Sequence, residues 1–412
     1  MKSFVPALLC VLLIVACDSN RQYKLTPFEY SSKVDTNDHP IEMQKKQRYT
    51  IMQEGVSADN LFDAARLNDF KRVDKHQYEV PVHPENSPIN MSPWYAFRVY
   101  ADAPKTIDIT LTYTEGIGRH RYWPKLSKDR QNWAIVDSSR FVVAPDSLSA
   151  TMTIEVDTDT LYVAAQEIID SNDLREWTEG LGSDKISRQV IGKSRLGRDL
   201  LSMDITNGDV AGKDIVLIMS RQHPPEVTGQ LAMMHFLEEI IAENELSNQF
   251  LDEYRVIVYP MLNPDGVDLG HWRHNAGGID LNRDWAYYRQ PEVRQMCEDV
   301  IARVNASGGN VKLGLDFHST WEDIYYIFDD TVQSKIQGFS REWIANIFER
   351  LPEDKGIISP FPVNSPVSKN WFYSQFNAEG ITYEIGDGTP RELIKEKGKV
   401  GAQEMMKLLL AK

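Results

Sequence analysis

The sequence is poor in cysteine. Its 412 residues include only Cys10, Cys17 and Cys297. The first two lie in an N-terminal segment that we expect to be processed or lipidated, so Cys297 is left alone and a disulfide framework is excluded. Stability must come from a packed core, and a hydrophobic content of 42% is sufficient to form one.

Positive charge is also scarce. Lysine and arginine number 45 against 60 acidic residues, which gives a formal net charge of −15. A protein whose main partner is nucleic acid needs a basic face to bind phosphates. We therefore expect an acidic surface and no nucleic-acid partner.

Long hydrophobic runs are missing except at the N-terminus. The opening MKSFVPALLCVLLIVACDSN has one lysine and then an apolar run that is short for a transmembrane helix but typical of a secretory signal. The small residues before Cys17 resemble a bacterial lipobox, which implies a signal peptide at 1–16 and lipidation of Cys17. We expect a lipoprotein of the bacterial cell envelope, anchored to a membrane and facing the periplasm or the exterior. An uncleaved membrane anchor is the alternative.

The remaining chain is too long for one ordinary core and suggests two domains. Residues 17–46 are polar and without periodicity, which predicts a flexible tether. Residues 47–167 hold short runs rich in β-branched and aromatic residues, such as TIDITLTYT and ATMTIEV, between turn signals. They predict an all-β sandwich domain, in which no cluster of reactive residues stands out.

From residue 168 to 412 the pattern alternates between strands and helices. Continuous apolar runs at 214–220, 255–262, 311–317 and 381–385 predict buried strands. Helical patterns lie around 228–245, 291–304, 336–350 and 391–411. The sequence therefore predicts an α/β domain with a mixed central sheet covered by helices on both faces.

Candidate ligands follow three of these predicted strands. His223 and Glu226 come shortly after VLIMS, His318 follows LGLDF, and Glu384 ends ITYE. Open α/β sheets bind ligands at the carboxyl ends of their strands, and the two prolines between His223 and Glu226 stiffen that loop. Zinc in hydrolytic sites takes three nitrogen or oxygen ligands and keeps a fourth position open. These four side chains predict a metal site with one further carboxylate beside it.

Three other histidines are weaker candidates. His235, three residues before Glu238, lies within an apolar helical run and is interpreted as an ordinary helix residue. His271 and His274 flank Arg273, but no strand end positions them.

The segment 259–285 is dense in Asn, Asp, Gly and Arg, which predicts a functional loop. Arg273 and Arg283 within it carry planar, always charged guanidinium groups suited to carboxylates and oxyanions. In an acidic protein they predict an anion site, and a pair of structural salt bridges is the alternative.

The order of these motifs resembles the zinc carboxypeptidases, the carboxypeptidase A-like funnelins of the M14 family. The likeness covers about 168–412 and rests on His223-x-x-Glu226, LNPDG, Arg273, GIDLNRDW, His318 and Glu384. The preceding β-rich part, with WYAFRVYA early and LYVAAQ at its end, resembles the domain that precedes the catalytic domain in the cytosolic carboxypeptidase subfamily. LNPDGVDLG and DLNRDW are similar to that subfamily as well.

The resemblance implies a metal centre and names its residues. His223, Glu226 and His318 would hold one Zn²⁺ per chain, with water in the open position. Asp280 of GIDLNRD would accept a hydrogen bond from a ligand histidine and so fix its tautomer.

The resemblance also implies roles in catalysis. Glu384 would act as general base in a zinc-water mechanism and pass the proton to the leaving amine, while Arg273 helps zinc to stabilise the oxyanion. Asn282 and Arg283 would bind the free C-terminal carboxylate of a peptide substrate. Lys369 lies in the segment that lines the side-chain pocket in the family, where a lysine favours an acidic terminal residue.

One feature departs from the family pattern. Digestive members carry a mobile tyrosine upstream of the catalytic glutamate, but ISPFPVNSPVSKNW contains none. Tyr373, Tyr325 or Tyr326 takes its place, or no residue does, which affects specificity more than hydrolysis. The leading hypothesis is a zinc-dependent metallocarboxypeptidase acting on C-terminal residues of peptides. A cell-wall peptide-trimming metallopeptidase and a non-catalytic peptide-binding lipoprotein are the alternatives.

Overall fold

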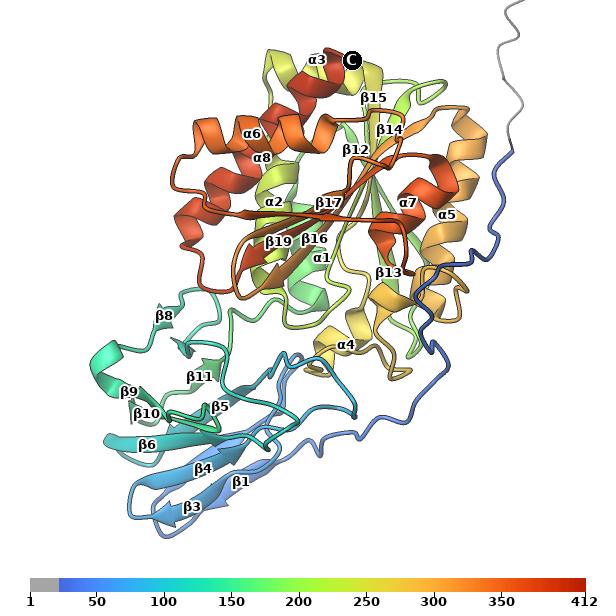
Figure 1. Cartoon of the computed structure of the whole chain (residues 1–412). Coiled ribbons are helices and arrows are strands. Elements are labelled where there is room, and N and C mark those ends of the chain that lie inside the picture. The colour runs from blue at the N-terminus through green and yellow to red at the C-terminus, as the bar shows by residue number, and fades with distance from the viewer. Residues whose placement is uncertain (1–21) are drawn as a thin grey trace, which may run out of the picture.

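A computed structural model of the chain describes residues 22–412, so the expected signal peptide and Cys17 lie outside the described residues. Two domains are stacked on each other (Figure 1). A domain built of β-sheets lies against one end of a larger α/β domain, and the chain ends on the far side of the α/β domain. In this part of the chain no helix is long and apolar enough to cross a membrane.

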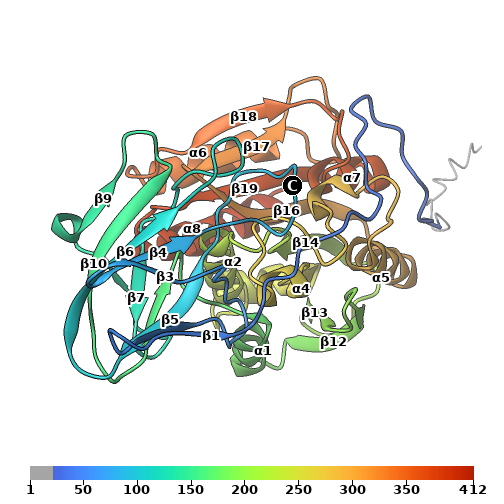
Figure 2. The same ribbon diagram turned by 90° about the horizontal axis from the view of Figure 1, so that it is seen from below.

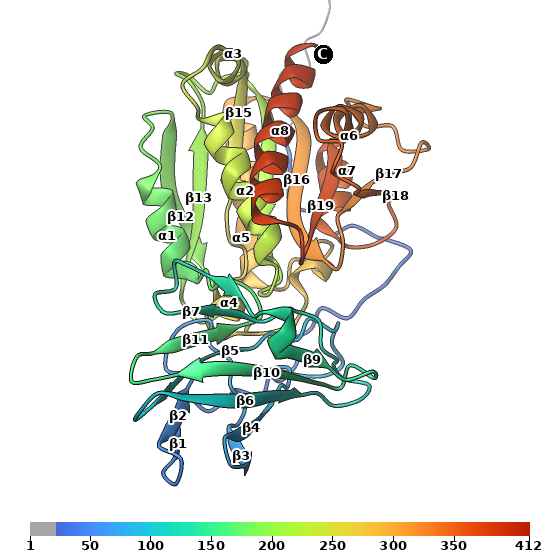
Figure 3. The same ribbon diagram turned by 90° about the vertical axis from the view of Figure 1, so that its left-hand side faces the viewer.

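The β domain has two sheets around a common core, as predicted for a sandwich (Figure 3). The strands alternate between buried and partly exposed residues, as on β6 (Lys105–Thr112), where Ile107, Ile109 and Leu111 face inward. The six-stranded sheet has the order β1 (Arg48–Ile51), β2 (Val56–Asp59), β5 (Ala96–Ala101), β11 (Leu161–Ala164), β7 (Lys125–Ser127), β8 (Ala134–Ile135). The five-stranded sheet has the order β3 (Lys71–Asp74), β4 (Gln77–Pro81), β6 (Lys105–Thr112), β10 (Ser149–Val156), β9 (Phe141–Val143), and the short η1 (Ser138–Arg140) precedes β9.

The α/β domain is built on one mixed sheet of eight strands. Their order is β12 (Ile186–Lys193), β13 (Asp199–Ile205), β15 (Tyr254–Tyr259), β14 (Asp214–Ser220), β16 (Val311–Thr320), β19 (Glu379–Gly386), β17 (Ile324–Phe328), β18 (Ile357–Phe361). The central strands β15, β14, β16 and β19 are parallel, whereas β13 runs antiparallel to β15 and β17 antiparallel to β19. The four central strands are those predicted from apolar runs, and the four outer ones were not anticipated.

Helices cover both faces of this sheet, as predicted (Figure 2). Alternate residues of β14 show the division: Val216 and Ile218 join one core, and Ile215 and Leu217 join the other. The first core is covered by α2 (Val227–Ile240), α3 (Glu245–Glu253), α6 (Phe339–Arg350) and α8 (Arg391–Leu410). The second is covered by α5 (Pro291–Ser307) and α7 (Ser368–Phe376). The remaining helices are α1 (Ser171–Gly180), α4 (Pro264–Asp268) and η2 (Leu281–Arg283).

Residues 22–46 differ from the flexible tether that their composition predicts. They run as an extended segment that passes α5 and α7 of the α/β domain and then crosses to the β domain (Figure 1). Tyr23 and Phe28 pack against the core that these two helices cover. The amide of Ser32 donates to the carbonyl of Asn364 at 2.8 Å. A few spaced apolar side chains are enough to hold a polar segment against a folded surface. Residues 22–46 are therefore packed and do not form the flexible tether that their composition predicts.

Candidate active site

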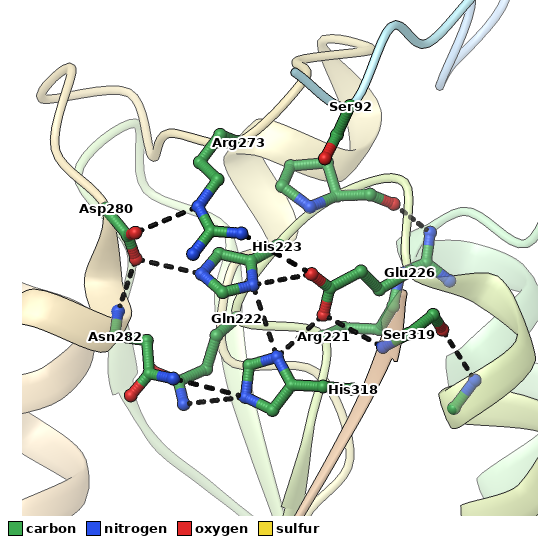
Figure 4. A network of polar contacts seen from close by, with 12 residues as sticks. Ser92, Arg221, Gln222, His223, Glu226, Arg273, Asp280, Asn282, His318 and Ser319 are labelled. Atoms are coloured by element: carbon green, nitrogen blue, oxygen red, sulfur yellow. Dashed lines mark hydrogen bonds and ion pairs between the residues drawn. The ribbon is translucent and has the colours of Figure 1, made fainter. Parts of the chain in front are cut away.

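Three side chains from two neighbouring strands and a helix start converge at the carboxyl edge of the sheet (Figure 4). His223 follows β14, Glu226 immediately precedes α2, and His318 lies near the end of β16. Glu226 lies between the two histidines: its Oε1 is 2.7 Å from Nδ1 of His223 and its Oε2 is 2.6 Å from Nδ1 of His318. The two Nδ1 atoms are 3.2 Å apart, and all three side chains are buried. The structure thus brings together the three predicted metal ligands.

The far nitrogen of each histidine faces a carboxylate. Nε2 of His223 lies 2.8 Å from Oδ1 of Asp280, and Nε2 of His318 lies 2.8 Å from Oδ2 of Asp316. An ionised carboxylate only accepts hydrogen bonds, so each Nε2 carries the proton and donates it. In a neutral ring the lone pair then sits on Nδ1 and points toward the other ligands.

This donor set fits a zinc ion. Two imidazole lone pairs and a carboxylate, all of them acceptors, meet in a buried space, and such groups repel one another unless a positive charge lies between them. The surroundings favour that charge, because carboxylate oxygens of Glu226, Asp280 and Asp316 lie within 2.8 Å of the nitrogens of the two imidazole rings. Two histidines and one glutamate are a common ligand set of catalytic zinc, and carboxylates that orient ligand histidines usually accompany it.

Glu384 lies beside these ligands. It is directly opposite His318 in the parallel register of β16 and β19. Burial and the neighbouring charge of Glu226 raise the pKa of Glu384 to about 8. Its Oε2 is buried and accepts no hydrogen bond from any group of residues 22–412. A carboxyl group with a raised pKa and a free oxygen is suited to accept a proton and return it.

Arg273 and Asp280 border the same cluster. Arg273 donates from Nε to Oδ2 of Asp280 at 2.8 Å, and its Nη1 lies 3.7 Å from Oε1 of Glu226. Burial disfavours the charge of Asp280, but Arg273 and His223 hold the pKa of this carboxyl well below its usual value. Asp280 therefore fixes both a ligand histidine and the arginine.

Asn282 and Arg283 line one side of a cleft of about 480 Å³ that also contains His223, Glu226 and Glu384. Asn282 is held in place, because its Oδ1 accepts from the amide of Ser368 at 3.0 Å. In Figure 4 it lies on the opposite side of the ligand cluster from Ser319. The two residues expected to bind the terminal carboxylate of a substrate thus line the same cleft as the predicted ligands.

The β domain contributes a wall to this cleft, which the sequence did not indicate. The contributing residues are Asn90, Met91, Ser92, Arg119 and Arg121. Arg121 joins the two domains, because it donates to Oδ2 of Asp387 at 2.7 Å, just beyond β19, and to Oγ of Ser92 at 3.0 Å. The β domain, in whose sequence no cluster of reactive residues stands out, therefore contributes polar and charged side chains to the cleft.

Lys369 and the three tyrosines occupy different environments. Lys369 borders the cleft but is buried, and its Nζ donates to the carbonyl of Ile327 at 3.0 Å. Of the three tyrosines, only Tyr326 lines the cleft. Tyr325 is buried and donates to Asp354 at 2.8 Å, and Tyr373 packs against the ring of Phe328.

The three weaker histidines stay apart from the cluster, as interpreted. His235 pairs with Glu238 on α2 at 2.9 Å. His271 Nδ1 contacts the carbonyl of His274 at 3.0 Å, and His274 Nδ1 contacts Oδ1 of Asn86 at 2.6 Å.

Two supporting residues were missed. Asp316 orients His318, and Gln222 donates from Nε2 to Oδ2 of Asp316 at 2.6 Å. The sequence could have indicated Asp316, because residues two apart on a strand face the same way and Asp316 is two residues before His318. Gln222 had none beyond its place next to His223.

Comparisons with known proteins agree with this geometry. A family model described as zinc carboxypeptidase matches residues 174–396, more than half of the chain. An uncharacterized protein of Zymomonas mobilis is 27% identical over 245 residues, which cover 57% of this chain and 60% of that protein. Bovine cytosolic carboxypeptidase 3 is 24% identical over 296 residues, which cover 64% of this chain and 28% of that protein. The chain thus spans less than two thirds of the length of these relatives.

The solved structures include a similar protein that spans both domains. A metallo-carboxypeptidase from Burkholderia cenocepacia superposes with a TM-score of 0.73 at 19% identity, covering 86% of this chain and 99% of that one. At this identity the likeness concerns the fold, which includes the β domain as well as the mixed sheet. The matched family model and the ligand cluster lead to the same conclusion: the chain belongs to the zinc carboxypeptidase family.

Proposed function

We propose that this protein is a zinc-dependent metallocarboxypeptidase that removes C-terminal residues from peptides. The observation that carries the proposal is the convergence of His223, Glu226 and His318 beside the unpartnered Oε2 of Glu384. When bound, zinc would polarise the scissile carbonyl and acidify the attacking water, and its charge would lower the pKa of Glu384 toward neutrality.

The residues of the chain would act in sequence. Arg283 and Asn282 would bind the terminal carboxylate of the substrate and so place the last peptide bond over the ligand cluster. The Nη atoms of Arg273, whose Nε is engaged by Asp280, would donate to the oxygen of the scissile carbonyl as it gains negative charge. Glu384 would take a proton from water and deliver it to the leaving amine, which restores the carboxylate.

A pair of peptides tests the terminal-carboxylate requirement. One ends in a free carboxylate and the other, of the same sequence, in a carboxamide, and products are identified by mass spectrometry. The proposal predicts stepwise loss of single residues from the first peptide only. Internal cleavage, or equal cleavage of the amide, would contradict it. Turnover confined to cell-wall stem peptides would assign the same chemistry to wall trimming, and zinc binding without any turnover would favour a peptide-binding role.

We also propose that the protein is a lipoprotein anchored through Cys17. The support is the apolar run and the small residues before this cysteine. Mass spectrometry of the protein extracted from its membrane should find an N-terminal, acylated Cys17, and Cys17→Ala should abolish acylation and release the protein from the membrane. An unmodified N-terminus that begins at Met1 would contradict the proposal.

A further inference from the structure

Arg273 lies in a loop whose main chain is held by the other domain. This loop, residues 269–279 between α4 and η2, is called the arginine loop below. Glu85 of the β domain accepts from three consecutive main-chain amides of the loop: Trp272 at 2.7 Å, Arg273 at 3.0 Å and His274 at 2.8 Å. Its side chain is fully buried. One carboxylate thus fixes the main chain on both sides of Arg273 and at Arg273 itself.

Other groups of the N-terminal part hold the ends of the same loop. Arg66 Nη1 donates to the carbonyl of Gly270 at 3.1 Å, and Asn86 Nδ2 donates to that of Gly278 at 3.2 Å. Gly270 has a φ of +66°, and a Cβ there would meet the main-chain oxygen of Ala65 at 2.6 Å, so only glycine permits this approach.

The side chain of Trp272 anchors the loop from the other direction. It is completely buried and belongs to the core of the β domain, not to either core of the α/β domain. The side chains at 272 and 273 therefore serve different domains: Trp272 is inserted into the sandwich, while Arg273 reaches the ligand cluster.

The ionised form of Glu85 is stable where it lies. Burial disfavours its charge, but His271, Arg66 and the amides of His274 and Trp272 outweigh burial and lower the pKa of this carboxyl. A carboxylate offers two oxygens with about four acceptor positions, so it satisfies three amides at once. A glutamine has one acceptor oxygen and would turn an NH₂ donor toward one or more of these N–H groups.

We propose that Glu85 is a positioning residue for Arg273, and that the β domain is thereby an integral part of the active site. The proposal rests on the function proposed above. Glu85 sets the main chain at Arg273. The side chain of Arg273 then meets Asp280, which in turn orients His223. The guanidinium of Arg273 can stabilise a developing oxyanion only if it already points toward the scissile carbonyl. A more mobile arginine loop should therefore lower turnover more than it weakens substrate binding.

The first test compares Glu85→Gln with Glu85→Asp and with the control Glu155→Gln, an exposed β-domain carboxylate paired with Arg140. Glu85→Gln should lower kcat about 10- to 100-fold with little change in KM and with zinc content retained. Glu85→Asp, which keeps the charge, should recover part of that loss, and the control should match the parent. Unchanged kcat in a folded Glu85→Gln protein would overturn the proposal.

The second test separates positioning from general support of the fold. In an Arg273→Lys background, where the guanidinium fork is already missing, Glu85→Gln should lower kcat less than about twofold, because the two residues act as one unit. An equal loss in both backgrounds would show that Glu85 does not act through Arg273.

Amide hydrogen exchange provides a readout that does not depend on turnover. Glu85→Gln should increase exchange at 272–274 and leave β14 and β16 unchanged, whereas unchanged exchange at 272–274 would overturn the proposal. If the parent protein hydrolyses no peptide, the proposed function fails, while the exchange experiment still decides whether Glu85 fixes the arginine loop.

Discussion

Nε2 of His223 lies 2.8 Å from Oδ1 of Asp280, and this contact connects the metal site to the arginine loop. The other oxygen of Asp280 accepts from Arg273, so one carboxylate orients a ligand and a candidate catalytic group. Asp280→Asn should disturb both, because an amide can present a donor to Nε2–H and carries no charge for Arg273. We expect zinc affinity and kcat each to fall about 10- to 100-fold.

Competition with a chromophoric chelator measures that affinity. Asp204, an acidic residue of the same domain that pairs with Arg255 at 2.5 Å outside the cleft, provides a matched Asp→Asn control. An Asp280→Asn protein with the affinity of the parent would show that His223 does not depend on this contact.

Removal of the metal should destabilise the fold. Without a cation, the buried Nδ1 atoms of His223 and His318 and the carboxylate of Glu226 face one another within 2.6 to 3.2 Å. Free zinc at 100 times its dissociation constant stabilises a one-site protein by about 2.7 kcal/mol. Thermal unfolding should therefore shift upward when zinc is restored to chelator-treated protein, and a His318→Ala variant should lose that shift. An unchanged Tm in the parent would contradict binding at this site.

Lys369 gives a pH-dependent prediction. Burial lowers the pKa of its ammonium to about 7, although Glu379 and Asp329 partly oppose the shift. If the ammonium reaches an acidic terminal side chain, kcat/KM for peptides ending in glutamate relative to leucine should fall as pH rises from 6 to 8, because the ammonium loses its proton. Lys369→Met should remove this dependence.

The lowered pKa of Lys369 also makes the free energy of unfolding depend on pH. Between pH 7 and the unfolded value near 10.5, the unfolded chain binds more protons at Lys369 than the folded chain, so its contribution to the free energy of unfolding rises with pH. Lys369→Met should flatten that rise in chemical denaturation. A variant that alters stability but not the glutamate-to-leucine ratio would show that Lys369 only supports the carbonyl of Ile327 at the end of β17.

The parts of the fold that the sequence predicted are those with a local cause. β14 and β16 are buried on both faces and must be continuously apolar, and His223 and His318 stand out because they end such runs. The outer strands β12 and β18 are mostly exposed and carry no such run, so nothing in their composition distinguished them from loops. Residues 22–46 look like a tether because a segment that packs on a finished surface needs few apolar residues.

The part of the site that escaped prediction depends on distant contacts. Glu85 is 187 residues from Trp272, and no local pattern marks a carboxylate that will accept from amides of another domain. Arg121 meets Asp387 only because the β domain packs against the carboxyl edge of the larger sheet. The metal ligands can be predicted from their spacing within one segment of the sequence. The residues that position the active site from the other domain can be identified only in the folded structure.

The central claim is that Glu384 moves the proton at a metal site formed by His223, Glu226 and His318. Its most direct test is mass spectrometry of the products that a soluble 18–412 fragment and its Glu384→Gln variant form from a peptide panel, with the zinc content of both proteins measured in parallel. We predict loss of single C-terminal residues with the parent. The variant should keep one zinc per chain while its rate falls at least about 10²- to 10⁴-fold, as expected for the loss of a general base. A variant that cleaves at the rate of the parent with zinc bound would contradict the assignment of Glu384.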